Sequence, residues 1–214
     1  MRCTFYRPEK TNIVEFENIV GKMEYDLKRL ITEEVSDLDV YYYIRGLLHA
    51  AKPLEHRDDM YFLGLDDPAS MPSDARVDYF YRPTYIAAAF IMKAILKYPE
   101  LENVHEICWE FADEIVAEIK EIFPKVLMGC TGRSFCGHGY GIIEQTIETV
   151  KFFIEAGAIE FVNKHPDMCP EFKELLEKIL SGYRKCLENG NTVNGWGTDF
   201  ADEVKMVLEL VDSL

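Results

Sequence analysis

The stretch "TYIAAAFIMKAILKY", residues 84–98, is the most continuously apolar part of the chain and decides its fold. Between Tyr85 and Leu96 apolar residues occupy every side of a helical wheel, and Lys93 is the exception. A helix that is apolar all round is typical of one buried in a protein interior. The uninterrupted apolar run, Tyr85 to Met92, is too short to span a bilayer. The stretch therefore predicts a helix that is buried on all sides.

Outside this stretch the apolar residues recur with the period of an amphipathic helix. The second expected helix begins at a capping-box arrangement, in which Ser36 precedes Asp39 by three residues. Together with the buried helix, these segments predict an all-α chain of about seven helices. The other expected helices cover residues 13–33, 36–50, 101–123, 140–157, 171–188 and 199–213.

The helical period is absent between residues 52 and 83, where the chain is rich in proline and aspartate. We expect one long loop there, ending at Pro83, because proline interrupts helices. Its several aromatic residues favour a loop that packs onto the body of the protein.

Length and charge limit the classes of function. A chain of 214 residues with 48% hydrophobic residues is expected to form one domain, 1–214. The formal net charge of −15 disfavours nucleic acid and anionic membranes as partners. The first ten residues, "MRCTFYRPEK", contain no apolar signal segment, so we expect a cytoplasmic protein whose six cysteines are reduced.

A weak internal repeat is visible in the second half of the chain. "GHGYGIIEQTIETVKFF" (137–153) aligns with "GWGTDFADEVKMVLELV" (195–211) at an offset of 195 − 137 = 58 residues. Such a repeat predicts stacked helical hairpins, as in an α/α solenoid or a partial toroid. This architecture resembles that of α/α-toroid enzymes, including prenyltransferases and terpene cyclases. No residue motif identifies a family, because "HRDDMYFLG" and "GLDDPAS" lack the third aspartate of a DDxxD box.

Three polar stretches precede the helices that the repeat places inside: "YRPTY", "GRSFCGHGY" and "NGWGTDF". If the repeat is real, these stretches gather on one rim, where helix N-termini offer unpaired N–H groups to a polar ligand. Arginines there would supply forked hydrogen-bond donors, and aromatic rings would stack on a sugar or a base. The alternative is that the aromatic rings fill gaps between helices. The candidate ligand-binding residues are Arg82, Tyr85, Arg133, Cys136, Tyr140 and Trp196.

His138 is the first candidate for catalysis, because it lies between two glycines and its imidazole could act as a general base near neutral pH. Glu144 and Asp199, or Asp78, could form the pair of carboxylates that a glycoside hydrolase uses. The alternative for His138 is a hydrogen bond that caps the neighbouring loop.

The cysteines near His138 permit two further interpretations. Cys136 could be a nucleophile activated by His138, although residues two apart rarely point together. Cys130, Cys136 and His138, with His165 and Cys169, are permissible metal ligands, but their spacing matches no usual zinc pattern. We therefore predict no metal site, and the sequence does not identify a cofactor.

Two functions from different classes follow from these patterns. The first is binding of a small polar ligand on the rim, with hydrolysis or transfer on a saccharide or a phosphorylated metabolite. The alternative is a helical-repeat adaptor that binds a basic protein segment. A third interpretation places the function on the surface of a homo-oligomer. Whether the chain is an enzyme stays open at this stage.

Overall fold

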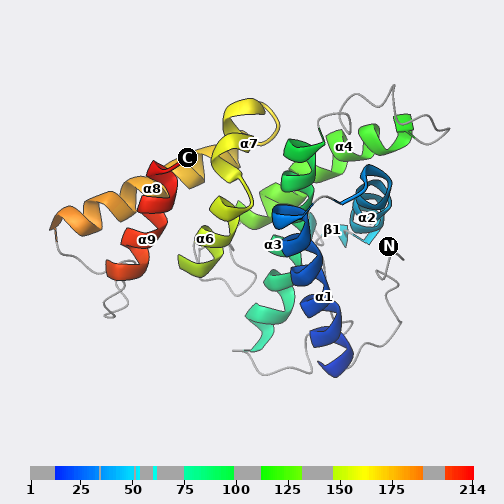
Figure 1. Ribbon diagram of the computed structural model, residues 1–214, viewed down its shortest axis with the longest axis horizontal. Coiled ribbons are helices and arrows are strands. Elements are labelled where there is room, and N and C mark those ends of the chain that lie inside the picture. The colour runs from blue at the N-terminus through cyan, green and yellow to red at the C-terminus, as the bar shows by residue number, and fades with distance from the viewer. Residues whose placement is uncertain are drawn as a thin grey trace.

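The helix that contains residues 84–97 lies in the middle of the fold (Figure 1). Its apolar residues from Ile86 to Met92 expose at most 2% of their surface, so the prediction of a helix buried on all sides is confirmed. The computed structural model describes residues 13–33, 35–50, 52–53, 60–61, 75–98, 112–131, 147–189 and 201–214.

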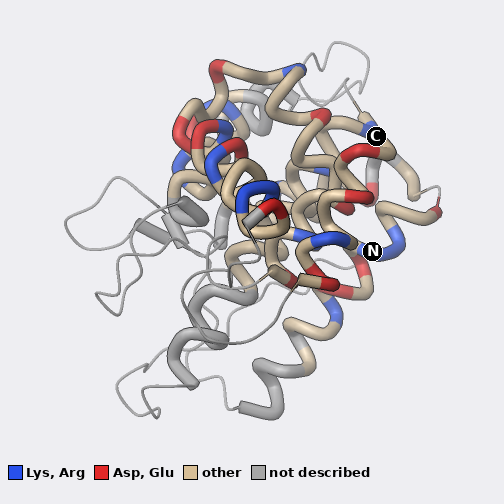
Figure 2. The backbone as a smooth tube through the Cα atoms, turned by 90° about the vertical axis from the view of Figure 1, so that its left-hand side faces the viewer, with Lys and Arg blue, Asp and Glu red and all other residues tan. Residues whose placement is uncertain are grey.

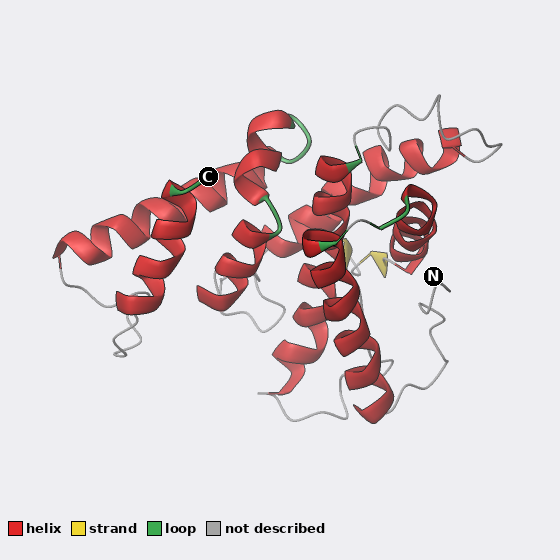
Figure 3. Ribbon diagram, in the orientation of Figure 1, coloured by secondary structure: helices red, strands yellow, loops and turns green. Residues whose placement is uncertain are grey.

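Within those residues the chain forms eight helices and one pair of two-residue strands (Figure 3). The all-α prediction is confirmed for this part of the chain. The strands β1 (Lys52–Pro53) and β2 (Met60–Tyr61) pair antiparallel inside the expected loop. The helices are α1 (Ile13–Thr32), α2 (Asp37–Ala50), α3 (Ala75–Lys97), α4 (Ala112–Thr131), α6 (Ile147–Glu155), α7 (Ala158–Lys164), α8 (Pro170–Asn189) and α9 (Ala201–Asp212).

The other helices are arranged around α3. α3 contacts α1, α2, α4, α6 and α7. α8 packs on α4, α9 packs on α6, and α8 and α9 pack on each other. The buried apolar side chains belong to one cluster that includes residues of every helix. Charged residues of both signs are interspersed along the helices (Figure 2). None of the described helices is both long and apolar enough to cross a membrane.

Both Pro83, the expected end of the long loop, and Pro124, which follows the expected end of a helix at residue 123, lie inside helices. α3 begins at Ala75 and runs through Pro83, so the expected loop 52–83 ends before residue 75. α4 contains Pro124 and continues to Thr131, beyond the expected end at residue 123. A proline inside a helix costs about 3 kcal/mol, which the burial of several large side chains exceeds. Beyond Pro124, Val126 and Leu127 are buried and supply this stabilisation.

The expected helix 140–157 ends within two residues of its predicted end, and the short helix that follows it was not predicted. α6 ends at Glu155, and Gly157 has the left-handed φ of 99° that redirects the chain into the short α7. A Cβ at this glycine would lie 2.7 Å from Leu96 Cδ1, so α3 also passes too close for a side chain.

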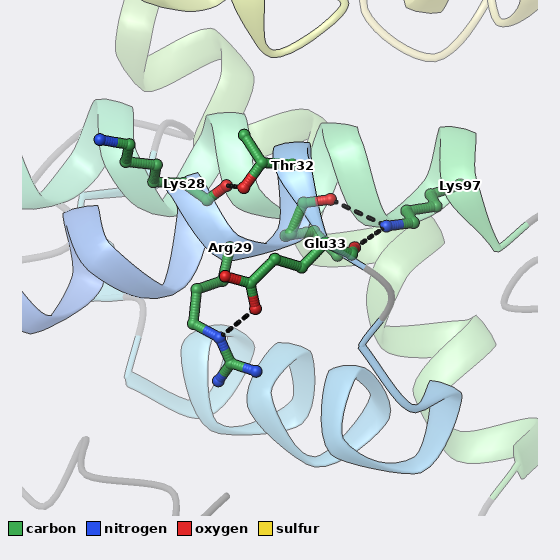
Figure 4. A network of polar contacts seen from close by, with 6 residues as sticks. Lys28, Arg29, Thr32, Glu33 and Lys97 are labelled. Carbon is green, nitrogen blue, oxygen red and sulfur yellow. Dashed lines mark hydrogen bonds and ion pairs between the residues drawn. The ribbon is translucent and has the colours of Figure 1, made fainter.

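The ends of α1 and α3 are tied together by hydrogen bonds (Figure 4). Lys97 Nζ donates to the backbone oxygen of Leu30 at 3.2 Å and to that of Glu33. The next residue, Tyr98, donates its hydroxyl hydrogen to the backbone oxygen of Val35. A lysine is favourable here, because the last carbonyls of a helix carry partial negative charge. We call these contacts the α1–α3 clamp.

At the start of α2, the expected cap is also present, with Asp39 N donating to Ser36 Oγ at 3.2 Å.

Replacing Gly157 by alanine should destabilise the protein by about 1–3 kcal/mol, because the left-handed backbone and the contact with Leu96 both disfavour a Cβ. Gly182, inside α8, is the matched control: a Cβ there meets nothing within 4 Å. Gly182→Ala should stabilise by about 0.5–1 kcal/mol through helix propensity. Chemical denaturation of both variants measures the difference, and equal effects would contradict the role of Gly157.

Removing the ammonium group of the α1–α3 clamp should destabilise the fold. Lys97→Met leaves the carbonyls of Leu30 and Glu33 without this donor, and we expect a loss of about 1–2 kcal/mol. Lys93→Met removes the same charge one turn earlier in α3 and should change stability by less than about 0.5 kcal/mol. Urea unfolding compares the two variants, and an equal loss in both would argue against the clamp.

Candidate functional site

Tyr85 is the candidate residue whose side chain the structure describes, and its ring packs between α3 and α6. The ring centroid lies 5.3 Å from that of Phe152 at an interplanar angle of 76°, and 6.5 Å from that of Phe153. The edge-to-face arrangement with Phe152 is the one that aromatic pairs prefer. Tyr85 remains half-buried rather than fully buried. Its ring therefore fills a gap between helices, as the alternative interpretation of these aromatic residues states.

Arg82 lies on α3, one turn before Tyr85. We expected "YRPTY" to precede a helix, but α3 starts at Ala75. The unpaired N–H groups at the start of α3 are therefore about 10 Å from Arg82 along the helix axis. The N-terminus of α3 therefore does not contribute to the expected rim at this position. The reason is that Pro83 lies inside α3 rather than at its start.

α3 and α6 run in the same direction. Tyr85 contacts Phe152, and further along both helices Leu96 approaches Gly157, which follows the end of α6. Figure 1 shows α9 running in that direction as well, next to α6. Consequently α6 and α9 both begin on the side of the molecule where the N-terminal half of α3 lies.

Asp78, the alternative carboxylate, belongs to the first turn of α3, and the other candidate residues lie outside the described residues. These are the catalytic candidates His138, Glu144 and Asp199 and the ligand-binding candidates Arg133, Cys136, Tyr140 and Trp196. The segments that contain them, 132–146 and 190–200, directly precede α6 and α9 in the chain. The structure thus gives the positions of the helices that follow these segments.

The first turns of α6 and α9 carry exposed carboxylates that the site prediction did not include. They belong to Glu148 in α6 and to Asp202 and Glu203 in α9. Acidic residues in a first helical turn offset the positive end of the helix dipole. Asp202 and Glu203 could have been noticed in the sequence, because they follow closely after the polar stretch "NGWGTDF", whereas Glu148 lies eight residues beyond "GRSFCGHGY".

α6 and α9 carry similar ion pairs at an offset that differs from the 58 residues of the expected repeat. Their first residues are 201 − 147 = 54 positions apart. The same offset relates the ion pair Lys151–Glu155 to Lys205–Glu209, each with an N–O distance of 3.7 Å. The offset of 54 between these ion pairs therefore differs from the offset of 58 that aligns the glycines in the sequence.

The described members of the cysteine and histidine set are separate packing residues. Burial raises the pKa of the Cys169 thiol to about 11, so it is protonated at neutral pH. His165 stacks on Phe161 with ring centroids 5.0 Å apart. Among the residues that the structure describes, no group of three or more His, Cys, Asp or Glu side chains could hold a metal ion. Cys136 and His138 lie outside them, and Cys130 belongs to the last turn of α4.

Comparisons with known proteins do not assign this chain to a family. No protein-family model, no curated protein and no solved structure matches it. Its function is therefore inferred from its own residues and their arrangement.

The contact between Tyr85 and Phe152 should be measurable as a coupling energy. In a double-mutant cycle with Tyr85→Leu and Phe152→Leu, we expect the two changes to be non-additive by about 0.5–1.5 kcal/mol, the usual value for aromatic pairs. Urea denaturation of the four proteins gives this number. Tyr85→Phe should keep most of the stability, since the ring remains. Additive effects would show that the ring is not held by α6.

Proposed function

We propose that this chain binds a small polar ligand on the side of the molecule where α6 and α9 begin. Hydrolysis or group transfer on a saccharide is the chemistry that its candidate residues would perform there. The polar segments 132–146 and 190–200, which precede these helices, would supply most of the contacts.

The register of α3 against α6 is the observation that supports this site. Tyr85 is level with Phe152, the sixth residue of α6, and Arg82 lies about 4.5 Å nearer to the start of α6 along the axis. Arg82 is therefore close in height to the beginning of α6, although it is far from the beginning of α3. An arginine at that level would be able to hydrogen-bond a ligand held by segment 132–146.

The charges of the first turns favour a saccharide over a phosphorylated metabolite. Glu148, Asp202 and Glu203 are exposed at the starts of α6 and α9, and the chain as a whole carries a charge of −15. Lys151 and Lys205 each form an ion pair toward the C-terminal end of their helix, with Glu155 and Glu209. A phosphate group would meet repulsion here, whereas the hydroxyl groups of a sugar hydrogen-bond to carboxylates.

Some of the candidate residues would bind the sugar, and others would transfer a proton. Trp196 and Tyr140 would stack on the sugar ring, and Arg133 would donate hydrogen bonds to it. His138 would accept a proton from the attacking hydroxyl or water, with Glu144 or Asp199 as the partner acid. Cys136 would contact the ligand without forming a bond to it.

The stacked-hairpin architecture belongs to this proposal. The equivalence of α6 and α9 at 54 residues supports a repeated unit in the C-terminal half of the chain. In a partial toroid of such units, successive inner helices run in the same direction and present their preceding loops on one face.

Native mass spectrometry of the chain incubated with a pool of neutral mono- and disaccharides tests the proposal. We expect one saccharide to remain bound to the wild-type protein. His138→Ala and Trp196→Ala should each lower its retention at least about tenfold while thermal unfolding stays unchanged, since each removes about 1.4 kcal/mol or more of contact energy.

His165→Gln serves as the matched control, because His165 packs on Phe161 away from the starts of α6 and α9. This variant should bind like the wild type. Retention that is unaffected by the His138 and Trp196 changes would remove these residues from the site. Capture of a basic polypeptide in place of any small molecule would favour the adaptor function.

A further inference from the structure

We draw no further inference here: the strongest candidate, the exposed face of α1 on which Tyr25 projects beside Gly21, carries no proposal, because nothing in the part of the chain that the structure describes shows what covers it.

Discussion

The burial of residues 86–92 of α3 on all sides is the constraint on which the rest of this structure depends. A helix without a polar face must be covered, and here α1, α2, α4, α6 and α7 cover it. Because α3 occupies the centre, each neighbour needs only one apolar face, and their amphipathic sequences supply it. The directions of α1 and α6 follow from contacts with α3 at defined heights, at Lys97 for α1 and at Tyr85 for α6.

The helices with a strong apolar period could be predicted closely from the sequence. α1, α2, α8 and α9 differ from the expected ranges by at most about two residues, the usual disagreement at helix ends. The errors lie at Pro83 and Pro124, where local propensity and tertiary packing favour different structures, and in the short helix α7, which was not predicted. At the prolines the burial of neighbouring side chains outweighs the cost of the proline. The left-handed φ of Gly157 and its close approach to α3 separate α6 from α7.

The candidate site was less accessible to sequence reasoning. Tyr85 and Arg82 were selected because they were expected at the start of a helix, yet both lie well inside α3. Their position along the helix axis relative to the start of α6 is set by the contact between Tyr85 and Phe152. These residues are 67 positions apart, so no local sequence pattern contains that information. The carboxylates in the first turns of α6 and α9 were visible in the sequence. Their meaning depended on knowing that the two helices lie side by side.

The α1–α3 clamp also bears on how the chain folds during synthesis. Lys97 bonds carbonyl oxygens at Leu30 and Glu33, which precede it by 67 and 64 residues. On the ribosome, α1 is complete long before these donors exist, so its last carbonyls must first be satisfied by water. The α1–α3 clamp therefore forms only after the end of α3 has emerged. Contacts of this sequence separation slow folding, because a long loop must close before they form.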